Sequence, residues 1–568
     1  MRHRQTFRAP PAERIRKARG LADQLGLSQV LAQVLVQRGM ETSDEIGRFL
    51  APKLSDLTPP EDLTDFDAAV DRVLDAVRGG EHVGVFGDYD VDGITSVAVV
   101  ASYLEALGLV VTPRLARRDS GYGIQPEDVR ELKEAGCSLL VACDVGTCDF
   151  DALEEARVVG LDVVVLDHHK VAERLPETVA LVNPSRPDSA FPEETLASVG
   201  LSFYLVSGLR TKLKAARLVA NPPDPRELLD LVAVGTVADV VPLRRANRIM
   251  VHRGLRLLGA GRRPGLRALV RRSRVVADVG VRARDISFGL APRLNAAGRL
   301  GDARPAFELL MAKDASQAEA LADRLEEMNG RRRAYQDMVF DAATQQVHWG
   351  QAGEHILVVD GAGWHPGVVG IVASKLVERF HRPAIVISLD EETGIGRGSG
   401  RSDGLVDLHA MLKRGEDMLL SFGGHAAAAG LVVKRDRIGD LRRFLNEAVA
   451  ALGTKSLGPV EVDAALEVGS IDASLMESLG GLEPVGAGNP SPLFAAMDVP
   501  IQSVRKMGGE HIRLQVGPRS RSITAVGFSM AEDAPAAGRT VDLVFRLEWD
   551  SYFGPGAVRL NLVQIGME

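Results

Sequence analysis

Four groups of acidic and histidine residues recur along the chain, each just after a short apolar run that indicates a β-strand. They are the acidic turn Asp88–Gly93 (sequence DYDVDG), Asp144, the triplet Asp167–His169 (DHH) and Asp239. In an open parallel α/β sheet the carboxyl ends of the strands face one crevice, so side chains at several strand ends converge there. We therefore expect these groups to form one site that holds two divalent metal ions.

The donor atoms of this site indicate its metal and its chemistry. Carboxylates, one imidazole and water suit Mg²⁺ or Mn²⁺ rather than a thiolate-rich zinc site. Asp90 and Asp92 lie two residues apart and can face one cavity, Gly93 lets the backbone turn sharply, and Asp144 can bridge ions. Two ions about 3.5–4 Å apart can activate water and stabilise the leaving oxygen of a displacement at phosphorus. The residues therefore predict phosphodiester hydrolysis.

A calcium-binding loop is the alternative for the acidic turn. Such a loop starts with the same spacing of aspartates but needs a glutamate at its twelfth position. Counted from Asp88, the twelfth residue is Val99. The turn therefore fits Mg²⁺ or Mn²⁺ better than calcium.

Length and composition indicate a large soluble protein. At about 150 residues per domain, 568 residues correspond to three or four domains. No apolar stretch reaches the roughly 18 residues that a membrane span needs, and the amino terminus lacks the apolar segment of a secretory signal. Cys137, Cys143 and Cys148 lack metal-ligand spacing. We expect reduced thiols in a cytoplasmic protein with no membrane partner.

The charge of the chain is unevenly distributed. A net charge of −8 and a pI near 5.9 would argue against a nucleic-acid partner if the charge were spread evenly. Residues 244–304, however, hold sixteen arginines, no lysine and three acids. This arginine run indicates a path for a polyanion, because the guanidinium group binds phosphates bidentately. The alternative is a solvated surface of an arginine-rich protein.

The pattern of apolar runs and breakers predicts an α/β protein with five parts. Strands and helices alternate in two lobes with parallel sheets, joined by a long helix and followed by short alternating strands that suit a small β-barrel of the OB type. The expected parts are an N-terminal helical segment (1–70), a first lobe (71–314), a connecting helix (315–348), a second lobe (349–455) and the barrel (456–568).

The motifs of the chain, from about residue 60 to its end, resemble those of the DHH phosphoesterase family. The acidic turn, the DHH triplet and residues 235–239 (GTVAD) are similar to the signatures of that family. Residues 292–299 (PRLNAAGR), 363–365 (GWH), 398–402 (GSGRS) and 422–425 (FGGH) resemble its single-strand exonucleases. The lobes would then be the DHH domain and the DHH-associated domain. The resemblance implies a 5′-to-3′ exonuclease for single-stranded DNA that uses two Mn²⁺ or Mg²⁺ ions in recombinational and mismatch repair.

The resemblance also assigns roles to residues. It implies six metal ligands, and it implies that Asp167 and His169 orient these ligands. The expected metal ligands are Asp88, Asp90, Asp92, Asp144, His168 and Asp239, and the expected catalytic residues are Asp90, Asp92, Asp144, His168, His169, Asp239 and His425. Ser399 and Arg401 would receive the 5′ phosphate, and the strand would be bound by Arg118, Tyr122, Arg293, Asn295 and Arg299.

Two other functions remain open. One is a smaller type of DHH phosphodiesterase that acts on short oligonucleotides or cyclic dinucleotides, and the other is a non-catalytic scaffold for single strands. The barrel and the arginine run favour a long strand, and the retained ligands argue against a scaffold. Val145 departs from the polar residue that the family usually has there, which could weaken the support of Asp144. The resemblance makes single-strand-binding protein and a recombination helicase plausible partners.

Overall fold

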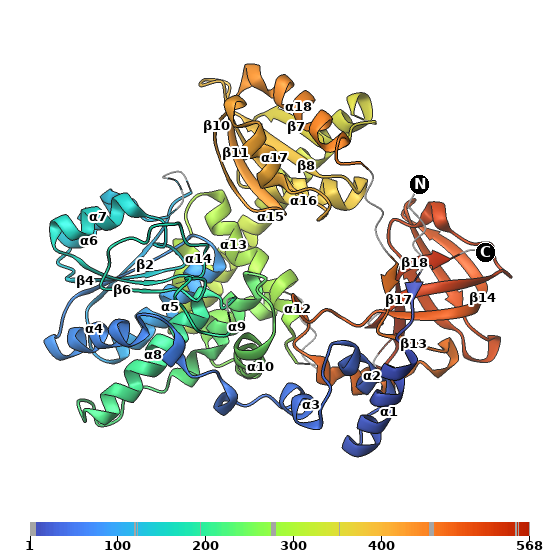
Figure 1. The fold of residues 1–568 in the computed structure, drawn as a ribbon, viewed down its shortest axis with the longest axis horizontal. Coiled ribbons are helices and arrows are strands. Elements are labelled where there is room, and N and C mark those ends of the chain that lie inside the picture. Colours follow the sequence, from blue (N-terminus) through green and yellow to red (C-terminus); the bar gives the residue numbers. More distant parts are fainter. Residues whose placement is uncertain are drawn as a thin grey trace.

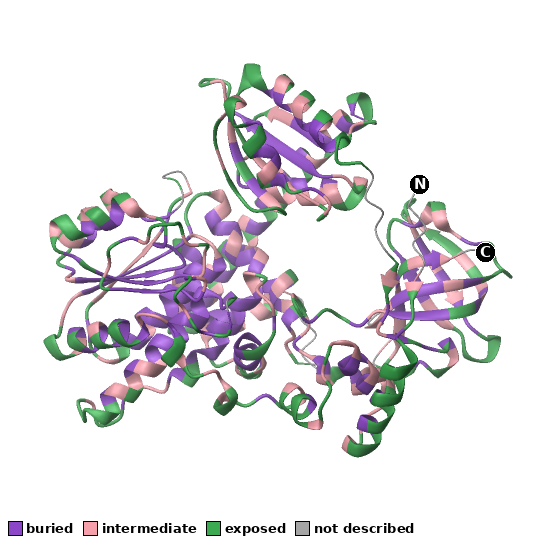
Figure 2. Cartoon of the chain, viewed as in Figure 1, coloured by how far each residue is buried: buried purple, intermediate pink, exposed green. Residues whose placement is uncertain are grey.

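The computed structural model describes residues 7–118, 121, 123–193, 195–273, 280–351, 353–453, 459–550, 554 and 556–566. Figure 1 shows three bodies: the first lobe in blue to green, the second lobe in yellow and orange, and a red barrel beside the blue N-terminal helices. Buried residues are concentrated in the interior of each body (Figure 2). No helix within the described ranges is long and apolar enough to cross a membrane.

The first lobe is built on a parallel sheet with strand order β3-β2-β4-β5-β6. Its strands are β2 (Val83–Gly87), β3 (Val111–Leu115), β4 (Leu139–Cys143), β5 (Asp162–Leu166) and β6 (Ala180–Val182). Every residue of β2 and β4 is buried, as expected for strands that are covered on both faces. Strand β3 lies on one side of β2, and the next strand in the chain, β4, lies on the other side. The strand order therefore reverses between β2 and β4, and parallel sheets bind ligands at the carboxyl ends of the strands at such a switch point.

Helices cover both faces of this sheet and extend beyond it. Those around the sheet are α4 (Phe66–Gly79), α5 (Val91–Ala106), α6 (Pro126–Glu134), α7 (Phe150–Val159) and α8 (Ser198–Ala215). A helical extension follows with α9 (Leu229–Ala238), α10 (Arg245–Ala260), α11 (Pro264–Arg272), α12 (Ala283–Asp285), a π-helix (Ile286–Leu290), α13 (Ala291–Leu300) and α14 (Arg304–Met311).

One helix, α15 (Ala315–Gly350), joins the two lobes where the sequence predicts a helix over 315–348. At 1.5 Å per residue its 36 residues span about 54 Å. Ala318, Ala322 and Leu325 belong to the core of the first lobe, whereas Val339 and Val347 belong to a core of the second. The helix is therefore anchored in both lobes.

The second lobe has a mixed sheet with order β10-β11-β9-β8-β7. Only β7 and β8 are parallel, and the other three pairs are antiparallel, so a wholly parallel sheet is the wrong prediction for this lobe. The reason is that residues 390–394 form a tight turn, which can join antiparallel strands but not parallel ones. The elements are β7 (Leu357–Ala362), α16 (Val369–Phe380), β8 (Ala384–Leu389), β9 (Ile395–Arg401), α17 (Leu408–Arg414), β10 (Leu419–Gly424), β11 (Ala428–Lys434) and α18 (Ile438–Ala450).

The C-terminal strands close into a five-stranded barrel, because β14 pairs with both β15 and β17. The barrel strands are β14 (Phe494–Met507), β15 (His511–Val516), β16 (Ile523–Gly527), β17 (Thr540–Trp549) and β18 (Val558–Gly566), preceded by β12 (Val460–Glu461), β13 (Ala464–Ala465) and α19 (Ala473–Leu479). Three N-terminal helices share the barrel's core: α1 (Ala12–Leu25), α2 (Gln29–Gln37) and α3 (Ser43–Leu50). Strand β1 (Phe7–Arg8) packs against a smaller cluster beside the barrel. Strand β1 also pairs with β12.

Six arginines of the run form ion pairs with acids from other segments in the described part of the chain. Arg263 pairs with Asp230 at 2.9 Å, and Arg272 pairs with Glu319 at 2.5 Å. Arg262, Arg271 and Arg284 also pair with glutamates outside the run. The expectation of one basic path along residues 244–304 therefore needs correction, because many of these charges stabilise helix packing.

Candidate metal centre

The acidic turn joins β2 to α5 at the switch point of the first sheet. Asp90 is the N-cap of α5, and its Oδ1 accepts hydrogen bonds from the backbone N–H groups of Asp92 (2.9 Å) and Gly93 (3.1 Å). A Cβ on Gly93 would lie 2.5 Å from the backbone N and O of Asp88. Only glycine therefore permits the turn that brings Asp88 and Asp90 to the end of β2.

Asp92 is fixed by the N-terminus of α8. Its Oδ2 accepts a hydrogen bond from the backbone N–H of Ser198 at 2.7 Å, and its Oδ1 accepts one from Val199 at 3.0 Å. The side chain is fully buried, so the positive end of the helix dipole stabilises its charge. These contacts hold the carboxylate in one orientation.

Asp144 follows β4 with a φ of +64°, a conformation that aspartate adopts more readily than most residues. Its backbone N–H donates to Leu166 O at 2.9 Å, and its Oδ1 accepts a hydrogen bond from the hydroxyl of Ser198 at 3.1 Å. The adjacent Val145 lies in the apolar core on one face of the sheet. Ser198 therefore supplies polar support for Asp144 in a chain that has valine at position 145.

The DHH triplet follows β5 and sets the protonation of its two imidazoles. Asp167 accepts hydrogen bonds from His169 Nδ1 at 2.7 Å and from the backbone N–H groups of His168, His169 and Thr147. Burial opposes the charge of Asp167, but these bonds hold its pKa well below the usual range. Burial likewise opposes the charge of His169, but Asp167 raises its pKa to about 9. Burial and the nearby His169 lower the pKa of His168 to about 4, so His168 is neutral.

Asp239 does not follow a strand, so that prediction is wrong. It is the C-cap of α9, whose first nine residues are all buried. Such a helix has no polar face, and a short apolar run that is buried on every side cannot be distinguished from a buried strand by its periodicity. The helix nevertheless brings Asp239 Oδ2 to 3.5 Å from His168 Nε2. The carboxylate therefore reaches the expected site from a helix end.

The carboxylates repel one another, which a bound cation would relieve. Burial and neighbouring carboxylates raise the pKa of Asp239 to about 9, raise those of Asp88 and Asp92 to about 7, and raise that of Asp144 well above its usual range. Asp88 Oδ1 and Asp239 Oδ2 are buried and have no hydrogen-bond partner among the described residues. Because an unpaired buried oxygen is costly, the cluster fits a bound cation.

The donor atoms fall into overlapping groups whose members lie within 4.8 Å of one another. One group consists of Asp92, His168 and Asp239, and another of Asp88, Asp90 and Asp144. His168 Nε2 lies 3.3 Å from Asp144 Oδ1 and so links them. Two adjacent groups of oxygen donors with one imidazole suit a pair of Mn²⁺ or Mg²⁺ ions.

The second lobe presents polar residues of the predicted set. Burial, together with the charges of Lys170 and His169, lowers the pKa of His425. On β9, Arg401 Nη1 donates to the hydroxyl of Ser399 at 3.0 Å. Both side chains reach the start of α16, where a Cβ on Gly370 would lie 3.0 Å from Ser399 Oγ.

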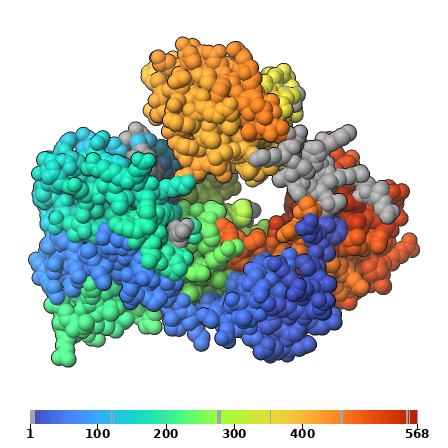
Figure 3. Space-filling model, viewed as in Figure 1, coloured from blue at the N-terminus to red at the C-terminus, as the bar shows by residue number. Residues whose placement is uncertain are grey.

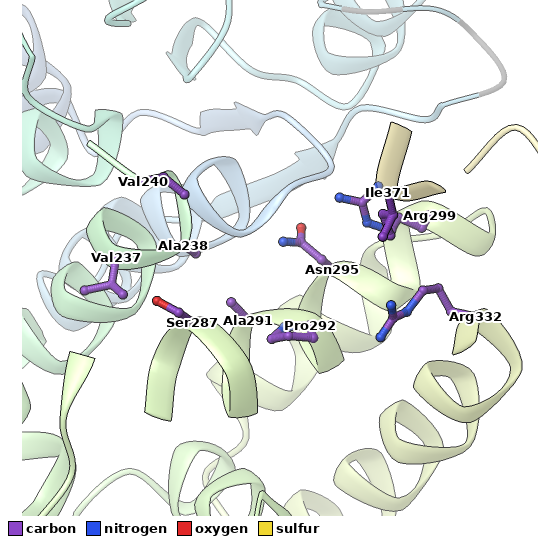
Figure 4. A pocket seen from close by; sticks show the side chains of 10 residues that line it. All are labelled: Val237, Ala238, Val240, Ser287, Ala291, Pro292, Asn295, Arg299, Arg332 and Ile371. Atoms are coloured by element: carbon purple, nitrogen blue, oxygen red, sulfur yellow. The ribbon is translucent and has the colours of Figure 1, made fainter. Parts of the chain in front are cut away.

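The predicted strand-binding residues separate into two sets. The guanidinium of Arg118 lies 4.4 Å from the ring centre of Tyr89 in the acidic turn, and Asn295 and Arg299 line a cavity next to Asp239 (Figure 4). Arg293 is buried instead, and it donates to Glu326, to Gly289 O and to Arg272 O. A strand-binding role for Arg293 is therefore corrected to a structural one. Tyr122 lies outside the described residues.

Ser198 and Val199 were not predicted as part of the site. They act largely through backbone N–H groups, which carry no side-chain signal in a sequence. The only available sign is the mainly apolar helix that begins at Ser198. Ser198 lies 54 residues beyond Asp144, so the contact between them is a product of the tertiary fold.

Comparison with known proteins identifies related chains. The family models described as DHH family, N-terminal domain, DHHA1 domain and RecJ OB domain match residues 82–236, 353–451 and 462–564. The single-stranded-DNA-specific exonuclease RecJ of Bacillus subtilis (strain 168) is 36% identical over 546 residues, which cover 94% of this chain and 68% of that protein. The protein of that name from Salmonella typhimurium is 34% identical over 561 residues, which cover 95% and 96%.

A solved structure matches over the whole chain. The crystal structure of RecJ from Thermus thermophilus in complex with Mn²⁺ has a TM-score of 0.84 and 28% identity, and the match covers 100% of this chain and 80% of that one. Its complex with Mg²⁺ gives a TM-score of 0.78 at 27% identity, with 100% and 79% covered. These matches confirm the predicted fold class of two α/β lobes and an OB-type barrel, and they confirm the family resemblance.

Proposed function

The chain belongs to the family of RecJ single-stranded-DNA-specific exonucleases, and we propose that it hydrolyses single-stranded DNA from the 5′ end with two Mn²⁺ or Mg²⁺ ions. The observation that carries this proposal is the pair of donor groups around His168. A pair of such ions supplies an activated water and stabilises the leaving oxygen. The retained set of carboxylates and His168 argues against a non-catalytic scaffold.

The protein groups around the metal centre have distinct roles in this proposal. Asp88, Asp90, Asp92, Asp144, His168 and Asp239 would hold the ions. Ser198 orients Asp144, and Asp167 accepts a hydrogen bond from His169 Nδ1 and so orients this imidazole. Burial and the charges of Lys170 and His169 lower the pKa of His425, and we assign this imidazole of the second lobe a role near the scissile bond.

The polarity of cleavage follows from a site for the terminal phosphate. Arg401 is partly buried, burial lowers its pKa, and no carboxylate pairs with it in the described part of the chain. Together with Ser399 it forms a cationic group next to the N-terminus of α16, which also favours an anion. We assign the 5′ phosphate to this group, so that cleavage proceeds from that end.

Access to the centre favours a single strand over a short compact substrate. Figure 3 shows an opening between the two lobes and the barrel on the face that it displays. The barrel matches the family model described as RecJ OB domain. Hydrolysis of a short oligonucleotide or a cyclic dinucleotide would need only the two lobes, so the barrel favours a longer strand. A strand that passes from the centre toward the barrel would gain contacts with length.

The remaining parts of the proposal rest on the family alone. We propose a role in recombinational and mismatch repair, with single-strand-binding protein and a recombination helicase as partners. Cys137, Cys143 and Cys148 are free thiols, which supports the proposed cytoplasmic location.

The test uses the purified full chain and single strands labelled at the 5′ or the 3′ end. With Mn²⁺ we expect the 5′ label to be released first as a mononucleotide, and with EDTA we expect no release. Asp144→Asn should abolish cleavage, whereas the matched control Asp151→Asn, at an exposed position on α7, should retain it. Release of the 3′ label first, cleavage in EDTA or full activity of Asp144→Asn would refute the proposal.

A further inference from the structure

Asn183 lies directly after β6, beside the two loops that follow β4 and β5 and carry metal ligands. Its exposed fraction is 1%, although asparagine is mostly found at the protein surface. A buried amide is costly unless its donors and its acceptor are paired. The partners of this side chain therefore explain why it lies in the interior.

The amide hydrogens of Asn183 join the two loops. Nδ2 donates to Thr147 Oγ1 at 3.0 Å, in the loop that begins with Asp144. It also donates to the backbone O of His169 at 2.9 Å, in the DHH triplet. Oδ1 accepts a hydrogen bond from the backbone N–H of Ser185 at 2.8 Å. Among side chains of this size, only an amide offers two such donors together with an acceptor. Asn183 is thus a bridge between neighbouring strand ends.

The bridge closes a cycle of hydrogen bonds. The backbone N–H of Thr147 donates to Asp167 Oδ2 at 3.1 Å, and Asp167 Oδ1 lies 2.7 Å from His169 Nδ1. The carbonyl of His169 then accepts from Asn183. Thr147 and Asp167 are each 1% exposed, so their hydrogen bonds are shielded from water and are strengthened by the low local dielectric. A closed and buried network of this kind holds both loops in one geometry.

The geometry of the two loops sets the distance between two metal ligands. Asp144 lies three residues before Thr147, and His168 lies between Asp167 and His169. Asp144 Oδ1 is 3.3 Å from His168 Nε2, and this contact links the two groups of donor atoms. Any movement of one loop against the other would change that distance directly.

We propose that Asn183 is a positioning residue that sets the spacing of the two metal-binding groups. The loops use both hydrogens of its amide, so it acts through them and not as a ligand. Replacing a residue that orients metal ligands typically costs about 10- to 100-fold in metal affinity or activity. The inference rests on the proposed function for its effect on cleavage, whereas its effect on metal binding needs no substrate.

The first experiment measures Mn²⁺ binding to the full chain by calorimetry. Asn183→Leu keeps nearly the shape of the side chain and removes its donors without adding a charge. We expect about tenfold weaker binding. The fitted number of sites counts folded protein, so partial unfolding does not imitate a lower affinity. The matched control Asn221→Leu, at an exposed asparagine that also precedes a proline, should bind Mn²⁺ as the wild type does.

Thr147→Val tests the same bridge from its other end, and it decides the matter if Asn183→Leu does not fold. Valine keeps the branched shape of threonine and removes the oxygen that accepts from Asn183. We expect about fivefold weaker Mn²⁺ binding, the effect of one neutral hydrogen bond. The double variant should bind no more weakly than Asn183→Leu alone, because both changes break one bridge. Additive losses would overturn the inference.

The second experiment records electron paramagnetic resonance of the Mn²⁺-loaded proteins. Two Mn²⁺ ions about 3.5–4 Å apart couple their spins, and their spectrum differs in shape from that of single ions. We expect the coupled spectrum for the wild type and Asn221→Leu, and the spectrum of single ions for Asn183→Leu. A general loss of folded protein would lower the intensity of the coupled spectrum without changing its shape.

Wild-type affinity together with a coupled spectrum in Asn183→Leu would overturn the inference. A wild-type protein that binds two Mn²⁺ ions but cleaves no single strand would instead refute the proposed function, and the loss of coupling in Asn183→Leu would still support the positioning role.

Discussion

Arg248 on α10 should hold the segment that leads into the barrel. Its guanidinium donates to the backbone carbonyls of residues 481–484 at 2.9–3.2 Å and to that of Phe49 at 3.1 Å. It also lies 3.6 Å from the centre of the Phe49 ring. One side chain thus ties the first lobe to the N-terminal helices and to the barrel segment. We expect Arg248→Met to loosen this junction.

The magnitude follows from the contacts of Arg248. Five hydrogen bonds at about 1 kcal/mol net each, with about 1 kcal/mol for the ring contact, sum to about 6 kcal/mol. Burial lowers the pKa of Arg248 from 12.5 to about 10, which corresponds to a cost on the order of 3 kcal/mol for its charge. Methionine removes both contributions. The net loss is therefore about 3 kcal/mol.

Native-state hydrogen exchange measures this loss at the junction itself. The backbone amides of Glu483, Gly486 and Asn489 are hydrogen-bonded within the segment and report its opening. A loss of about 3 kcal/mol predicts exchange faster by about a hundredfold at these amides. The matched control Arg253→Met, at an exposed position on α10, should leave them unchanged. Equal exchange in the two variants would refute the role of Arg248.

Three further changes test single contacts. Ser198→Ala removes the hydroxyl that orients Asp144, and we expect about tenfold weaker Mn²⁺ binding by calorimetry; an unchanged affinity would argue against that role. Gly93→Ala forces a methyl group into the backbone of the acidic turn, so thermal unfolding should show a loss on the order of 2 kcal/mol, and an equally stable variant would contradict the close packing. Hydrogen bonds from Arg72 lower the pKa of Glu81 below its ordinary value of 4.5, so this contribution to stability is complete above pH 4.5 and is lost as the pH falls. Arg72→Met should therefore cost about 1 kcal/mol at pH 7 and less below pH 4.5, and a cost that is constant with pH would contradict this linkage.

The parts of the fold that depend on local patterns could be predicted from the sequence. The apolar run 139–143 is strand β4, and the polar stretch that begins at residue 315 is one helix, because burial on both faces and an unbroken polar pattern leave clear signals. The acidic turn, Asp144 and the DHH triplet follow strands as expected, so the convergence of their carboxylates follows from the parallel sheet.

The errors concern contacts between distant segments. Asp239 ends a helix rather than a strand, because a run that is buried on every side carries no period. Arginine is a residue type that commonly binds phosphate, but the Arg293 side chain forms a hydrogen bond to Glu326, 33 residues away. The same holds for Arg263 and Arg272, whose acidic partners lie outside the arginine run. Charge counted along a sequence therefore overestimates the charge that is available to a ligand.

The central claim is that two adjacent groups of donors each hold one metal ion. Anomalous scattering at the manganese edge, from crystals of this protein with Mn²⁺, measures this directly. The structure predicts two peaks about 3.5–4 Å apart, one beside Asp92, His168 and Asp239 and the other beside Asp88, Asp90 and Asp144. A single peak, or peaks away from these side chains, would contradict it.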